Sequence, residues 1–174
     1  MSLAEEFAKR YAGLRSAYGT FTASNDLRED GKASGKNITI SKELSDKDLL
    51  GLWDGHLSGR QSVGIVAIDE TNSCVWGAID VDEYQLDLKD LAIKIAKQDL
   101  PLVLCRSKSG GAHIYIFLNE PVAAAMLQRK LRQIAASIGY GQAEIFPKQT
   151  KLLLDRGDRG STLNMPYFGG ENST

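Results

Sequence analysis

The sequence predicts an α+β fold in which helices cover one face of a mixed or antiparallel sheet. Two observations predict it. Short apolar or alternating segments are separated by turn residues, and two longer segments repeat apolar residues at helical spacing. The 174 residues suit a single domain, which at this size can bury a core without disulfides or a structural metal. We expect an N-terminal helical unit followed by the order β-β-α-β-β-α-β.

The N-terminal unit is predicted to occupy about residues 1–60. Residues 3–14 carry apolar side chains at helical spacing, and residues 46–53 follow a serine that makes a good N-cap. Between them, residues 19–36 are rich in Gly, Ser, Asn, Asp and Lys and predict a loop or mobile flap. Alternation over residues 38–40 indicates a short strand.

The core is predicted to occupy about residues 61–170. The expected strands span residues 63–68, 74–81, 102–105, 113–118 and 143–146, and the expected helices span residues 86–98 and 123–138. The turn sequence between the first two strands predicts that they form a hairpin. Short apolar runs at 152–154 and 163–165 indicate two further strands. No period of 20–50 residues recurs, which excludes a repeat protein.

Composition and charge restrict the class of protein. Cys74 and Cys105 each lie inside an apolar run and indicate small buried hydrophobes in a reducing, cytoplasmic setting. No apolar run approaches the ~20 residues that span a bilayer, so we expect no membrane partner. The net charge of -1 is unusual for a protein that holds nucleic acid through phosphates alone. Together with the loop-like C-terminal sequence, it indicates a domain excised from a longer protein whose other parts bind nucleic acid firmly.

The segment AIDVDEY places two carboxylates on one face of a strand. Side chains two residues apart share a face, so Asp80 and Asp82 point the same way. Paired carboxylates repel each other unless a cation lies between them, and they are the oxygen ligands that Mg²⁺ or Mn²⁺ prefers. A solvated strand end explains the pair equally simply, so the pair by itself is a weak signal.

The segment CRSKSGGAHIYIFL predicts an anion-binding turn between two strands. Glycines let backbone N–H groups approach an anion closely, and cationic and hydroxyl side chains add donors. The candidate residues are Arg106, Ser107, Lys108, Ser109 and His113. The same segment also suits an ordinary hairpin turn with solvated cations. It is not a Walker A loop, because the sequence contains no GxxxxGK[ST].

Two later segments add candidates. Glu144 in AEIFPKQ lies on an otherwise apolar strand, and we expect it to be buried, which is rare for a carboxylate unless it is paired or bound to a metal. Lys148 offers the simpler explanation, neutralisation by an ion pair. Asn164, in GSTLNMPYF, could contact a sugar or a base, or serve only a structural turn. An acid pair, a basic glycine turn with His and a third acid on successive strands together indicate a nucleotidyl-transfer site.

These residues resemble the archaeo-eukaryotic primase superfamily, and specifically the phage and conflict-system branch of its primase-polymerases. Its signatures are an Asp-x-Asp on a strand, a small-residue loop ending in His, and an apolar strand bearing an acid. They match Asp80 and Asp82, residues 109–113, and Glu144. Further similarity at 56–59, 106–117, 144–149 and 163–170 extends the resemblance from about residue 56 to residue 170.

The resemblance implies an RNA-recognition-motif-like (RRM-like) catalytic sheet preceded by a small α/β unit. It also implies a DNA primase-polymerase, of phage or mobile-element replication or of a defence system, which transfers nucleotides from nucleoside triphosphates by a two-metal mechanism. Asp80, Asp82 and Glu144 would hold two Mg²⁺ or Mn²⁺ ions. The incoming triphosphate would contact Arg106, Ser107, Lys108, Ser109 and His113, with Lys148 and Asn164 as further contacts. The implied partners are a single-stranded DNA template, a primer, and a helicase or helical priming domain.

Two alternative functions are set against the primase-polymerase. A rolling-circle endonuclease needs two metal-binding histidines close together, whereas His56 and His113 are far apart. A catalytically silent nucleic-acid or nucleotide-binding module would use aromatic side chains for base stacking, and Tyr115 and Phe117 alternate on one strand face. Such a module has no need of the acids.

Overall fold

The computed structural model of the protein describes residues 1–27, 33–83, 85–107 and 110–172. The helices are α1 (Leu3–Arg10), α2 (Asp46–Leu57), α3 (Leu88–Ala96) and α4 (Ala124–Ser137). The strands are β1 (Ala17–Leu27), β2 (Ala33–Ser41), β3 (Gly64–Val66), β4 (Ser73–Val81), β5 (Leu102–Arg106), β6 (Ala112–Ala123), β7 (Glu144–Phe146) and β8 (Thr162–Asn164). Short 3₁₀ helices follow at η1 (Leu154–Arg156) and η2 (Gly170–Asn172). None of these helices is both long and apolar enough to cross a bilayer, as far as the described residues show.

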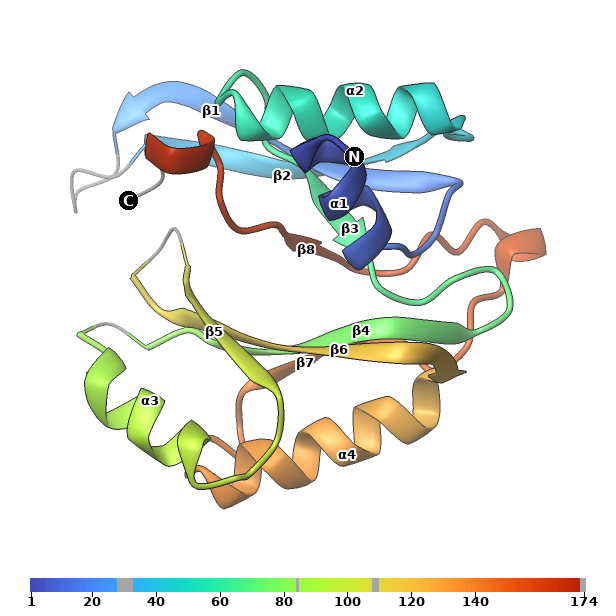
Figure 1. Ribbon diagram of the computed structural model, residues 1–174. Helices are drawn as coiled ribbons and strands as arrows, with labels where there is room; N and C mark the ends of the chain where they lie inside the picture. The colour runs from blue at the N-terminus through green and yellow to red at the C-terminus, as the bar shows by residue number, and fades with distance from the viewer. Residues whose placement is uncertain (28–32, 84, 108–109, 173–174) are drawn as a thin grey trace.

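The fold is α+β, as predicted, but its strands form two antiparallel sheets in separate layers (Figure 1). The first sheet has the order β2-β1-β3-β8 and lies beneath α2. The second has the order β5-β6-β4-β7, and α3 and α4 cover its outer face. The chain order β4-α3-β5-β6-α4-β7 is a βαββαβ arrangement. Its outer face is the main apolar core, where strand residues such as Ile79 and Ile114 pack against Leu131 of α4.

Two sequence-based expectations about elements are wrong. Most of residues 19–36 is not a loop, because β1 and β2 pair in a long hairpin whose ladder is made by backbone groups and needs no apolar side chains. Residues 152–154 form no strand, and η1 begins at Leu154 instead. The strand expected at 163–165 is present as β8.

The hairpin predicted between residues 63–68 and 74–81 is also wrong. β3 pairs with β1 and β8 in the first sheet, whereas β4 pairs with β6 and β7 in the second. The predicted turn does form, because the Asp69 carboxylate accepts hydrogen bonds from the backbone N–H groups of Thr71 and Ser73. It carries the chain from one sheet to the other. Since β3 and β8 both join the first sheet, the expected division near residue 61 does not separate the two sheets.

An aromatic cluster joins the two layers. Tyr11, which directly follows α1, lies 5.5 Å from the ring centroids of Trp53 on α2, Trp76 on β4 and Tyr115 on β6. The Trp76 indole N–H donates to the carbonyl of Ala12 at 2.9 Å. The N-terminal segment is therefore the centre of the second apolar core, between the sheets.

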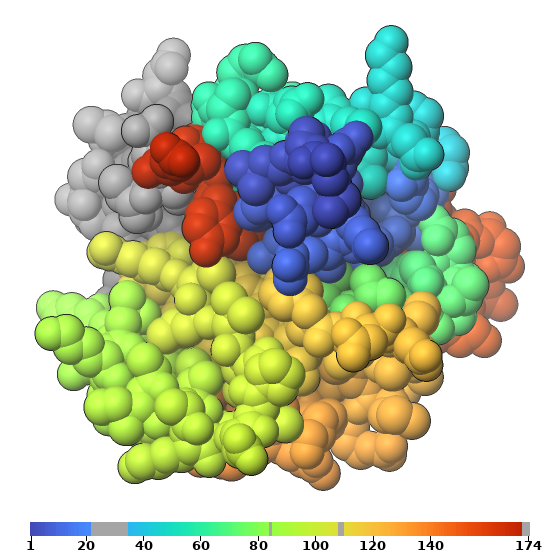
Figure 2. Space-filling view, viewed as in Figure 1, coloured from blue at the N-terminus to red at the C-terminus, as the bar shows by residue number. Residues whose placement is uncertain are grey.

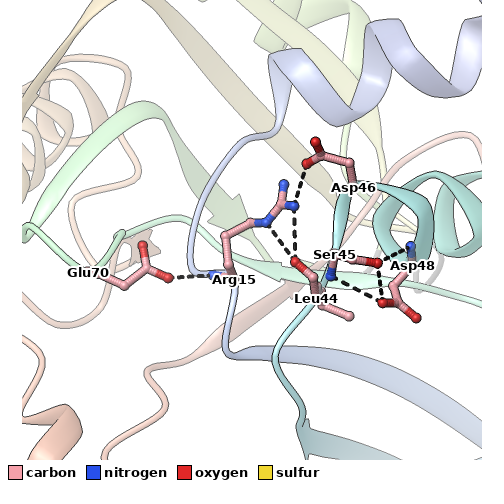
Figure 3. Close-up of polar contacts among 6 residues, drawn as sticks. All are labelled: Arg15, Leu44, Ser45, Asp46, Asp48 and Glu70. Atoms are coloured by element: carbon pink, nitrogen blue, oxygen red, sulfur yellow. Dashed lines mark hydrogen bonds and ion pairs between the residues drawn. The ribbon is translucent and has the colours of Figure 1, made fainter.

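Arg15 fastens the same segment to two other parts of the chain (Figure 3). Its guanidinium donates to the carbonyl of Leu44 and to the carboxylate of Asp46, at the start of α2. Its backbone N–H donates to the Glu70 carboxylate in the turn between the sheets, at 2.8 Å. Beside it, Ser45 and Asp48 form the capping box that begins α2. These contacts tie the segment before β1 to the start of α2 and to the turn that leads from the first sheet to the second.

Candidate active site

One row of side chains crosses the second sheet. The register places Asp80 of β4 opposite His113 of β6 on one side and opposite Glu144 of β7 on the other. On the next strand, Cys105 of β5 lies opposite His113. Residues directly opposite each other in adjacent antiparallel strands share a face, so all four side chains belong to one face of the sheet.

This face is the one turned toward the first sheet and α1. Ala78 and Trp76 alternate with Asp80 along β4 and are buried in the inter-layer cluster with Tyr11. Ile79 and Val81 point the other way, into the core beneath α3 and α4. The row therefore lies at the end of β4 between the two layers, while the helices support it from behind.

His113 is held by both of its ring nitrogens. Nε2 lies 3.3 Å from Oδ1 of Asp80, and Nδ1 lies 3.0 Å from the hydroxyl of Tyr115. The His113 side chain is 10% exposed and that of Asp80 is 22% exposed, so the pair is close to solvent without being surrounded by it. Tyr115 is fully buried, and burial raises the pKa of its hydroxyl well above the ordinary range.

Glu144 is not buried, which corrects the expectation from its apolar surroundings. Its side chain is 60% exposed, because β7 is a short edge strand and Glu144 is its first residue. The Lys148 ammonium lies 2.6 Å from Oε2 of Glu144 and 5.0 Å from the centre of the Phe146 ring. Asp82, two residues beyond Asp80, is exposed.

The basic turn rests directly on the end of the acidic strand. The Ser107 N–H donates to the carbonyl of Gly111 and closes the hairpin. A β-carbon at Gly111 would lie 2.2 Å from the Val81 carbonyl oxygen, so only glycine permits this approach. Arg106 is exposed at the end of β5, and Ser107 is buried. Lys108 and Ser109 lie outside the described residues.

Asn164 is separated from this row in the fold. It lies on β8 of the first sheet, where its side-chain amide donates to the carbonyl oxygen of the Asn37 side chain at 3.4 Å. Within the described part of the chain, no hydrogen bond or ion pair links it to the acids. The register thus aligns Asp80, His113 and Glu144 in one row, with Lys148 and Arg106 at its edges, and leaves Asn164 on the opposing sheet.

The donor set matches a hard divalent cation in chemistry and strand placement, because Asp80, Asp82 and Glu144 offer carboxylate oxygens from adjacent strands. Their side chains are not gathered, however. Among the described residues, no three His, Cys, Asp or Glu side chains are placed to hold one ion. Asp80 instead contacts His113, and Glu144 contacts Lys148. Binding a metal ion there requires Asp80 and Glu144 to turn from these partners.

A groove of about 690 Å³ borders the row at Cys105 and Arg106. It runs between α1, β5 and the C-terminal segment, and its aromatic lining is Phe7, Tyr11, Phe117 and Tyr167. Figure 2 shows this side of the molecule, with α1 (blue) and the C-terminal segment (red) above β5 (yellow). Burial raises the pKa of the Cys105 thiol, so this cysteine is a poor nucleophile. Asp80, Asp82 and Glu144 are not among the residues that line the groove.

The structure gives two residues of the site contacts that the sequence pattern does not predict. The sequence predicts Cys105 only as a buried hydrophobe, and in the structure it also lies opposite His113, in the same row as Asp80 and Glu144. The alternative of a binding module expects Tyr115 to stack on a base. In the structure its ring is fully buried, and its hydroxyl contacts His113. The spacing of two from His113 was the available signal, since it put both side chains on one face. The burial of Tyr115 also weakens the alternative of a silent base-stacking module.

The chain matches the model of a known protein family. The sequence model for the archaeo-eukaryotic primase domain of the TOTE conflict system matches residues 6–173. No curated protein matches the chain.

Proposed function

Since the chain belongs to the archaeo-eukaryotic primase domain family of the TOTE conflict system, we propose that it is a DNA primase-polymerase. In this proposal it catalyses template-directed nucleotidyl transfer from nucleoside triphosphates to a primer or an initiating nucleotide. The βαββαβ order of the second sheet supports the RRM-like catalytic core that the sequence led us to expect.

The observation that carries the proposal is the register of the second sheet. It brings Asp80, His113 and Glu144 into one row, although they are far apart in the sequence. The contact of Gly111 with the Val81 carbonyl places the basic turn beside the same acids. Carboxylates on adjacent strands next to a turn with cationic and N–H donors suit a reaction between metal-bound phosphates.

Asp80, Asp82 and Glu144 would hold two Mg²⁺ or Mn²⁺ ions. When bound, such ions neutralise phosphate charge and favour deprotonation of an attacking hydroxyl. Lys148 would leave Glu144 and become available to a phosphate. Arg106 at the end of β5 would pair with the triphosphate, as would the donors of residues 107–111.

His113 contributes an N–H donor in this proposal. Its Nε2 lies 3.3 Å from Asp80, and His113 is the second residue of β6, directly after the turn, so a displacement of the ring would aim the N–H at a triphosphate oxygen bound there. Hydrogen bonds to an anion from a partly buried donor are stronger than those in water and fix its orientation. The single-stranded template, the primer and any helicase or priming domain remain predicted partners.

A primed-template assay with labelled nucleotides and Mg²⁺ or Mn²⁺ tests the proposal. Asp80→Asn combined with Asp82→Asn should reduce incorporation by about 10³-fold or more, because it removes carboxylates that neutralise developing charge. Asp90→Asn is the matched control, because Asp90 is an exposed acid on α3, on the far side of the sheet. Template binding without metal-dependent incorporation by the unaltered protein would favour the silent binding module instead. Parallel reactions with deoxy- and ribonucleotides would define the preferred sugar.

A further inference from the structure

We propose that Tyr115 is a positioning residue that fixes the tautomer and orientation of His113. Its buried hydroxyl would donate to Nδ1, so that the ring proton lies on Nε2 and faces the acids. The consequence for catalysis rests on the proposed function. The hydrogen-bond arrangement itself does not, and it can be tested on the protein without substrate.

The first step of the argument is the chemistry of Asp80. A carboxylate oxygen only accepts hydrogen bonds, and Oδ1 of Asp80 lies 3.3 Å from Nε2 of His113. At this distance the contact is longer than a typical N–H···O hydrogen bond, so it favours a proton on Nε2 but does not fix the proton there by itself. In a neutral imidazole, Nδ1 is then an acceptor, and the group 3.0 Å away that can donate to it is the hydroxyl of Tyr115.

The opposite arrangement is disfavoured by burial. With a proton on Nδ1, the Tyr115 hydroxyl would have to accept, and its own proton would need another acceptor. Tyr115 is fully buried, and His113 is the hydrogen-bond partner that the structure gives for its hydroxyl among the described residues. An unsatisfied buried hydroxyl is costly, so the hydroxyl is expected to donate.

The ring of Tyr115 is held firmly enough to position another side chain. It contacts Tyr11 at 5.5 Å, Trp76 at 6.0 Å and Phe117 at 6.0 Å between ring centroids. Opposite it on β4 is Ala78, whose small side chain leaves space for the ring. The hydroxyl is thus carried by a fully buried ring with three aromatic neighbours, and its contact with Nδ1 holds His113 against this cluster.

The functional consequence is that a single N–H serves two partners. In the free protein, Nε2–H points at Asp80. When a triphosphate is present, the same N–H can donate to it without a change of tautomer. Without the Tyr115 hydroxyl, the ring can turn or place its proton on Nδ1, which would direct a lone pair at the acids and the triphosphate.

Nitrogen-15 NMR of the imidazole rings tests the arrangement directly. The chain has two histidines, so the spectrum contains two ring systems. We expect His113 in the unaltered protein to be protonated at Nε2, and Tyr115→Phe to give a mixture of tautomers or an Nδ1–H ring. Tyr11→Phe is the matched control, because it removes a hydroxyl from the same cluster that does not contact His113. His56 should be unchanged in both variants.

Protonation of His113 at Nδ1 in the unaltered protein would overturn the proposal, as would an unchanged tautomer in Tyr115→Phe. A kinetic measurement then tests the role in catalysis. Tyr115→Phe should lower kcat/KM for the nucleotide about tenfold, as is typical when a supporting hydrogen bond is removed. It should cause no further loss in the His113→Ala background, because the hydroxyl acts through His113. Equal losses in both backgrounds would show a merely structural role.

The two measurements separate the two claims. An Nε2–H ring that depends on Tyr115, in a protein without incorporation activity, would contradict the proposed function and leave the positioning role intact. Normal activity together with a His113 tautomer that does not depend on Tyr115 would contradict the positioning role and leave the proposed function intact.

Discussion

The two histidines of the chain occupy contrasting environments. Both rings are largely buried, and both nitrogens of each ring have a polar partner. His56 accepts from the Val63 N–H at 3.1 Å, and its Nε2 is 2.8 Å from the carbonyl of Pro166. His113 instead contacts the side chains of Asp80 and Tyr115.

The partners decide what each ring does. His56 bonds to the backbone of Val63, just before β3, and to that of Pro166, which lies 110 residues after His56, so it joins α2 to the entry of β3 and to the C-terminal segment. Burial lowers its pKa, and the surroundings leave no opening for a ligand. His113 contacts two side chains at the edge of an open site, and its partners can be exchanged. Burial alone therefore does not distinguish a structural histidine from a functional one, whereas the nature of its partners does.

The largest expected effect is that of His56→Ala on stability. The substitution leaves the Val63 N–H and the Pro166 carbonyl without their partner and creates a cavity, at a cost of about 3–5 kcal/mol. Urea unfolding followed by circular dichroism measures it. A loss below about 1 kcal/mol would mean that His56 is not the structural member of the pair.

His113→Ala should act on activity instead. We expect incorporation to fall about 100-fold, or about 2.7 kcal/mol in transition-state stabilisation. The free energy of unfolding should change by less than about 1 kcal/mol, because the ring lies at the site edge. Full activity with reduced stability would reverse the assignment of roles.

The pH dependence of stability gives a third, smaller contrast. His56 has a lowered pKa in the folded protein, so below its unfolded value of about 6.5 the unfolded chain binds the proton more readily. The stability due to neutral His56 is therefore present above pH ~6.5 and is lost as the pH falls below it. Denaturant midpoints between pH 5 and 8 measure this loss.

The variant His113→Ala should retain the same loss, which assigns it to His56. Asp48, whose pKa is lowered to about 2 by Lys42 and Ser45, affects stability only at more acidic pH. A flat profile between pH 5 and 7 would contradict the prediction.

The smallest expected effect is that of Lys148→Ala on stability. Its ion pair with Glu144 is 2.6 Å long but exposed, so we expect a change within about 0.5 kcal/mol. If Lys148 binds phosphate as proposed, the KM for the nucleotide should nonetheless rise. Comparing unfolding midpoints with nucleotide titrations separates the two, and a large loss of stability would make Lys148 a structural residue.

The periodic features of the sequence predicted local structure well. The spacing of two put Asp80 and Asp82 on one face, and the four helices lie where their apolar spacing or caps indicated. The pairing of strands could not be read in this way. β3 and β4 are both apolar and consecutive, and nothing in their composition says that one belongs to each sheet.

The site depended on the same missing information. That Glu144 and His113 flank Asp80 is a matter of register between distant strands, which period-two patterns leave open. The exposure of Glu144 follows from its position on a short edge strand, not from its apolar neighbours. The partner of Tyr115 was likewise hidden, although its distance from His113 along the strand was visible.

The position of Tyr11 has a spectroscopic consequence. The chain has two tryptophans, and Tyr11 contacts both: Trp53 in the layer of the first sheet and Trp76 in the layer of the second. Both indoles are fully buried, so both should emit at short wavelength in the folded protein. If the two layers separate in a single step, both indoles are exposed to water at the same time, and the emission maximum shifts to longer wavelength in one transition. Intrinsic tryptophan fluorescence therefore reports, without a label, whether the layers of the first and second sheets stay packed together as nucleotide or template is added.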